Sequence, residues 1–73
     1  MDFDNIGKNI SKKIIDYENI NNYSLNQLFM LFSDVYKVSD TERDKLLMCT
    51  VNSITEQGYD IISTHPLKLE RFK

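Results

Sequence analysis

Residues 23–58 read YSLNQLFMLFSDVYKVSDTERDKLLMCTVNSITEQG, and this stretch decides the fold because it contains two start signals for helices. Ser24 is followed three residues later by Gln27, and Ser39 by Glu42. Each pair fits the capping box, in which the serine hydroxyl caps a free helical N–H and the Gln or Glu side chain reaches back to the serine N–H. The sequence therefore predicts two helices that begin after these serines and pack as antiparallel neighbours.

Apolar residues within this stretch recur at helical spacing. Gly58 follows the second set, where a left-handed residue commonly ends a helix. The spacing predicts helices over 25–37 and 40–57. The apolar stripe of the first is wider than one neighbouring helix can cover, which indicates either a central position or a surface for a partner. The two sets are Leu25, Leu28, Phe29, Phe32, Val35 and Tyr36, and then Leu47, Thr50, Val51 and Ile54.

The flanking segments complete the predicted fold. Residues 3–20 form a candidate first helix, since its apolar side chains share one face. Residues 59–73 form a short C-terminal arm, in which Leu67 and Leu69 alternate as in a strand while Pro66 could open a short helix. We therefore expect an all-α fold: one domain over 1–73, with three helices built on the antiparallel hairpin 25–57. The apolar face of helix 3–20 consists of Phe3, Ile6, Ile10, Ile14 and Tyr17.

Size and composition limit the classes of protein. A chain of 73 residues buries a marginal core, so good helix packing or a homodimer would have to support it. Cys49 is the only cysteine and His65 the only histidine, which excludes a disulfide and argues against structural zinc. A net charge of −2 argues against a general nucleic-acid binder. Without a signal peptide or a spanning apolar run, we expect a cytoplasmic protein with no membrane contact.

No residue pattern predicts catalysis. His65 has no acid or base partner nearby in the sequence, and Cys49 lies in mid-helix rather than at a helix N-terminus. Asp40, Glu42 and Asp44 suit the first turn of a helix and lack the spacing of a calcium loop. We therefore expect no enzyme, no catalytic residue, no bound metal and no cofactor.

Two groups of side chains are candidates for binding a partner. The apolar candidates could meet another protein, or they could fill the core or a homodimer seam. The basic candidates in the arm could contact an acidic protein or a phosphate backbone, or they could be solvated. The apolar group is Met30, Leu31, Tyr36, Met48 and Tyr59, and the basic group is Lys68, Arg71 and Lys73.

A family resemblance covers about half of the chain. The pattern Phe32, Glu42, Leu46-Leu47, Val51, Ile54, Gly58 and Ile61 resembles the small connector and biofilm regulators of the YmgB/AriR kind. The helical hairpin is more distantly similar to Sda-type inhibitors of histidine kinases. The family continues into a helix after the position of Ile62, whereas this chain has Pro66. Neither family is catalytic, and both resemblances imply a small helical protein that binds a signalling protein.

These observations lead to one functional expectation and two alternatives. We expect a non-catalytic regulator, phage- or plasmid-encoded, that binds a signalling or transcription protein through an apolar helical face and inhibits or redirects it. The first alternative is a small DNA-associated transcriptional regulator that uses the helix 40–57 or the basic arm. The second is a structural subunit of a larger assembly.

Overall fold

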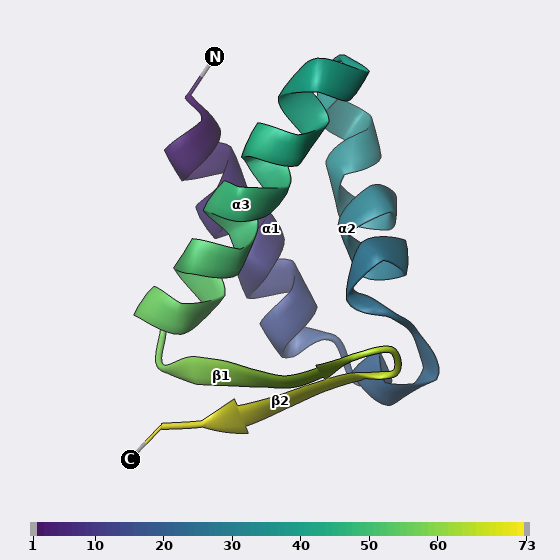
Figure 1. The fold of residues 1–73 in the computed structure, drawn as a ribbon, viewed down its shortest axis with the longest axis vertical. Coiled ribbons are helices and arrows are strands. Elements are labelled where there is room, and N and C mark those ends of the chain that lie inside the picture. Colours follow the sequence, from purple (N-terminus) through teal and green to yellow (C-terminus); the bar gives the residue numbers. More distant parts are fainter. Residues whose placement is uncertain (1, 73) are drawn as a thin grey trace.

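A computed structural model describes residues 2–72 and contains three α-helices followed by a β-hairpin (Figure 1). The helices α1 and α3 cross each other, α2 lies beside them, and the hairpin runs across one end of the helical layer (Figure 1). The elements are α1 (Phe3–Asp16), the 3₁₀ turn η1 (Ile20–Asn22), α2 (Leu25–Ser33), the 3₁₀ turn η2 (Asp34–Tyr36), α3 (Asp40–Glu56), β1 (Tyr59–Thr64) and β2 (Leu67–Arg71).

The expectation of an all-α fold is wrong, because residues 59–71 form an antiparallel two-stranded sheet. In β1 the half-buried and exposed residues alternate, which is the period of a strand with one face on a core. β-branched and aromatic side chains such as Tyr59, Ile61 and Ile62 favour this extended backbone. The described part of the segment 59–73 is therefore a β-hairpin and not an arm. It turns at His65-Pro66, whose peptide bond is cis.

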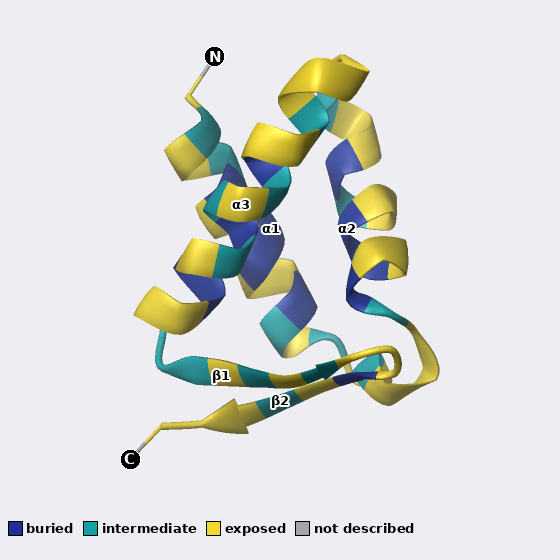
Figure 2. Cartoon of the chain, viewed as in Figure 1, coloured by how far each residue is buried: buried dark blue, intermediate teal, exposed yellow. Residues whose placement is uncertain are grey.

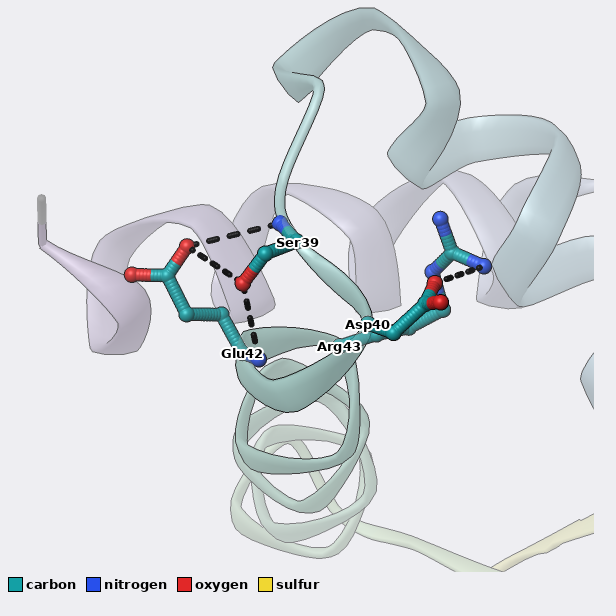
Figure 3. A network of polar contacts seen from close by, with 4 residues as sticks. All are labelled: Ser39, Asp40, Glu42 and Arg43. Carbon is teal, nitrogen blue, oxygen red and sulfur yellow. Dashed lines mark hydrogen bonds and ion pairs between the residues drawn. The ribbon is translucent and has the colours of Figure 1, made fainter.

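Both predicted helix starts are confirmed. The Gln27 side chain accepts from the Ser24 N–H at 2.7 Å, and the Ser24 hydroxyl accepts from the Gln27 N–H at 3.1 Å. Ser39 and Glu42 make the same two contacts, each at 3.4 Å (Figure 3). These bonds satisfy N–H groups that the first turn of a helix leaves free, so they fix where α2 and α3 begin.

The helix ends differ from the predicted ones. The first helix was expected to reach residue 20, but α1 ends at Asp16 because Tyr17 has an extended backbone. The second was expected to reach residue 37, but α2 ends at Ser33 and continues as the 3₁₀ turn η2. Lys37 then adopts a left-handed conformation with φ 51°, which ends η2 before α3 begins.

The predicted packing of the second helix against the third is wrong, because α3 packs mainly against α1, and the crossing of α1 and α3 brings two backbones into contact. A Cβ atom built on Gly7 would lie 2.9 Å from the Cβ and carbonyl carbon of Cys49, closer than real Cβ atoms come. One turn along α1, the buried Ser11 hydroxyl donates to the Ser53 hydroxyl at 2.9 Å. The Gln57 amide donates to the same serine pair. The small side chains permit the close approach, and their polar atoms find partners within it.

The hairpin closes the core from below the helices. Leu67 at the start of β2 is fully buried, and its N–H donates to the Tyr23 carbonyl at 2.8 Å, which ties β2 to the segment between α1 and α2. At the other end the Phe72 N–H donates to the Gly58 carbonyl at 2.7 Å. The buried apolar core contains Ile10, Ile14, Leu25, Leu28, Phe29, Val38, Leu46, Ile54 and Leu67 (Figure 2).

We expect Gly7→Ala to lower the free energy of unfolding by about 1–3 kcal/mol, because the new methyl group has to push α1 away from α3. The matched control is Asn9→Ala, which adds no atoms at an exposed position of the same helix. Urea denaturation followed by circular dichroism measures both variants. A Gly7→Ala protein as stable as the Asn9→Ala protein would contradict the close crossing.

Candidate partner-binding surface

Three large apolar side chains are exposed on α2 and η2: Met30 at 46%, Leu31 at 56% and Val35 at 70% of their surface. Leu31 and Val35 are four residues apart, about one helical turn, and Met30 precedes Leu31 directly. We call these three residues the α2 patch. Buried segments of α2 face the other helices and its exposed segments face outward (Figure 2). The patch therefore lies on the side of α2 that the core does not use.

The other predicted apolar candidates divide into two kinds. Met48 on α3 is 66% exposed, but its neighbours on the same face are the exposed polar residues Asp44, Asn52 and Thr55. It is thus an isolated apolar side chain and does not enlarge the patch along α3. Tyr36 and Tyr59 are half-buried and pack against the core, so only part of each ring is accessible to a partner.

Val35 is the patch residue that the sequence analysis assigned to the wrong side. A period of 3.6 residues placed it on the core face together with Phe32, but the chain is a 3₁₀ turn at this point. Val35 is 70% exposed there, whereas Tyr36 beside it is half-buried and packs against the core. The signal that could have revealed this is Asp34, since an exposed acidic residue interrupts the apolar run there.

The three basic candidates of the C-terminal segment do not form a cluster in the described residues. Lys68 is exposed on β2. The Arg71 guanidinium lies 5.0 Å from the centre of the Tyr59 ring and donates a hydrogen bond to its hydroxyl, so it is engaged within the hairpin. Lys73 lies outside the described residues.

A polar groove of ≈ 730 Å³ lies between the first turns of α1 and the C-terminal half of α3. The Cys49 thiol opens into it and donates to an Asp4 carboxylate oxygen at 3.5 Å. Burial, and then the hydrogen bond and negative charge of Asp4, raise the pKa of the Cys49 thiol above its ordinary value of 9.0. The thiol therefore stays protonated at neutral pH, which makes it a weak nucleophile. The sequence did not reveal this contact because it joins residues 45 positions apart.

Among residues 2–72 no three His, Cys, Asp or Glu side chains gather in a group that could hold a metal ion. His65 is exposed in the turn of the hairpin. In the same range, none of the helices combines the length and apolar character needed to cross a bilayer.

The chain matches no protein-family model, no curated protein and no solved structure. The resemblance to the YmgB/AriR regulators and to the Sda-type inhibitors therefore stays a prediction that rests on the residues quoted for it.

We expect Asp4→Asn to make Cys49 react several times faster with iodoacetamide at pH 8, because losing the negative charge lowers the pKa of the thiol and raises the thiolate fraction. Mass spectrometry of the intact protein measures the rate. The control is Asp44→Asn on the exposed face of α3, which should leave the rate unchanged. Equal rates in the two variants would show that the Asp4 carboxylate does not influence the thiol.

Proposed function

We propose that the chain is a non-catalytic regulatory protein that binds another protein through the α2 patch and inhibits or redirects it. The observation that carries this proposal is the exposure of Leu31 and Val35 four residues apart on one side of the helix, with Met30 exposed next to Leu31 in the sequence. Single exposed apolar residues are normal on proteins, whereas a contiguous group marks an interaction surface more often. The mechanism would be occlusion, in which the patch covers a functional surface of the target.

The exposed surface of the single chain is typical of a folded monomer of its size. The chain exposes 5007 Å², close to the roughly 4,700 Å² that a folded monomer of 8.6 kDa typically has. Leu67 of the hairpin also completes the buried core within one chain. A homodimer stays a prediction, and sedimentation of the purified chain at several concentrations would test it.

The charges of α3 give the DNA-binding alternative less support. If α2 and α3 formed a helix-turn-helix, the first turns of α3 would face the bases and phosphates. These turns expose Asp40, Glu42 and Asp44, and Arg43 is already paired with Asp40 at 3.5 Å (Figure 3). Carboxylates at this position repel the phosphate backbone.

We expect the variant Leu31→Asp/Val35→Asp to capture at least about tenfold less of the target protein than the wild type, because two carboxylates would be forced into an apolar contact. The measurement is quantitative mass spectrometry of proteins that the tagged full chain captures from an extract of its host. The matched control is Met48→Asp, which introduces the same group at an exposed apolar position of another helix.

Two results of this experiment are decisive. A protein captured by the wild type and the Met48→Asp control, but not by the double variant, supports the proposal. If every captured protein is retained equally by all three, the α2 patch is not the binding surface. Since the substituted side chains are exposed, circular dichroism should show all variants folded, with stabilities within about 0.5 kcal/mol of the wild type.

A further inference from the structure

The β-hairpin has an outer face that no other described element covers. Tyr59 and Ile61 of β1 are half-buried and pack against the core, whereas Asp60 between them and Ile62 at the bulge are exposed. On β2, Lys68 and Glu70 are exposed in the same alternation. The hairpin forms the lower boundary of the molecule, so this face points away from the helices (Figure 1).

Two carboxylates face each other at the centre of this surface. Asp60 and Glu70 are direct cross-strand partners in the antiparallel register. Directly opposite residues have Cβ atoms about 4.5–5.5 Å apart, and like charges at this distance destabilise a hairpin. The pair is therefore unfavourable within the isolated chain.

Lys68 is exposed on the same face two residues from Glu70, but no ion pair closer than 4.0 Å joins it to Asp60 or Glu70 within residues 2–72. Over residues 2–72 the ion pair closer than 4.0 Å is the one between Arg43 and Asp40, far from the hairpin in sequence. Arg71 follows Glu70 directly, but it lies opposite Tyr59 and is held over the ring and hydroxyl of that residue. The nearest guanidinium is thus fixed by a neighbour on the other face of the hairpin.

Apolar side chains lie on both sides of the acidic pair. Ile62, at the β-bulge that follows Ile61, is 54% exposed. Phe72 is 48% exposed, and its N–H bonds to Gly58, which has no side chain that could cover the ring from the opposite strand. Side chains on one face of a strand are about 7 Å apart, so each apolar group stands one such step from the carboxylates.

We propose that the outer face of the hairpin binds an extended segment of a partner protein in which a Lys or Arg side chain is flanked by apolar side chains two residues away on either side. The basic group would lie between Asp60 and Glu70, and the apolar groups would cover Ile62 and Phe72. Charge complementarity selects this occupant, because a cation removes the repulsion that the free chain retains. The proposal concerns a second surface and does not depend on the α2 patch.

The test is a titration of the ¹⁵N-labelled full chain with a nine-residue peptide whose centre reads Leu-Thr-Arg-Thr-Leu. We expect saturable amide shifts confined to residues 58–64 and 67–72. A peptide with Glu in place of Arg should bind at least about tenfold more weakly, because it brings a third negative charge to the site. Equal binding of the two peptides, no saturable shift, or the same shifts from MgCl₂ alone would overturn the proposal.

A pair of variants separates the roles of charge and fold. Asp60→Asn/Glu70→Gln should weaken binding of the arginine peptide about fivefold or more, and should raise the midpoint of thermal unfolding by about 1–5 °C because the repulsion is gone. Asp44→Asn/Glu56→Gln removes the same net charge from exposed positions of α3 and should leave the affinity unchanged. If both variants weaken binding equally, the peptide senses only the net charge of the protein, and the proposed site is wrong.

The α2 patch variant distinguishes this proposal from the proposed function. Leu31→Asp/Val35→Asp should bind the arginine peptide as the wild type does, because its substitutions lie on a different element. Loss of peptide binding in that variant would place the peptide on α2 and overturn the assignment to the hairpin. Failure of the peptide to bind at all would leave the capture experiment on the α2 patch unaffected.

Discussion

The close crossing of α1 and α3 is the contact on which the other elements depend. Gly7 allows the two backbones to approach until Cys49 occupies the space of a missing Cβ. At this separation only short side chains fit, and Ser11 and Ser53 fill it with a buried hydrogen bond. Because an unpaired buried hydroxyl would be unfavourable, this bond also fixes how far one helix can slide along the other. The crossing thereby sets the positions of the α3 C-terminus and of the hairpin that follows.

The hairpin completes the core that the three helices leave open. Gly58 has φ 97°, a conformation that glycine adopts readily, and β1 follows it directly. The chain then returns so that Leu67 enters the core and its N–H reaches Tyr23. The same hydrogen bond occupies the first N–H on the open edge of β2, and the bulge after Ile61 distorts β1. Both features protect a short sheet from pairing with another chain through its edges.

Interactions between residues close together in the sequence were predictable, and those between distant residues were not. The capping boxes join residues three positions apart, so the sequence predicts the starts of α2 and α3 correctly. The hairpin was missed because its turn lacks an Asn-Gly or Asp-Gly pair and because Ile61-Ile62 at the bulge breaks the alternation. The contact of Leu67 with Tyr23 has no local signal at all, since it joins distant parts of the chain.

The candidate surfaces were predictable only in part, for the same reason. Met30 and Leu31 fall outside the main apolar stripe of α2, so their exposure follows from the helical period. The exposure of Val35 does not, because the helical period placed it in the apolar stripe and it is nevertheless 70% exposed. The pairing of Asp60 with Glu70 depends on the strand register. The sequence did not predict the hairpin, so it could not predict this register.

The two proposed surfaces are separable from the forces that hold the fold together. Every side chain of the α2 patch is exposed, and so are the carboxylates and apolar groups of the hairpin face. The contacts that position them, the helix crossing and the bond from Leu67 to Tyr23, are made by other residues. An exposed apolar cluster contributes little to folding, and an unrelieved pair of carboxylates opposes it. The two binding proposals account for both features, whereas stability does not.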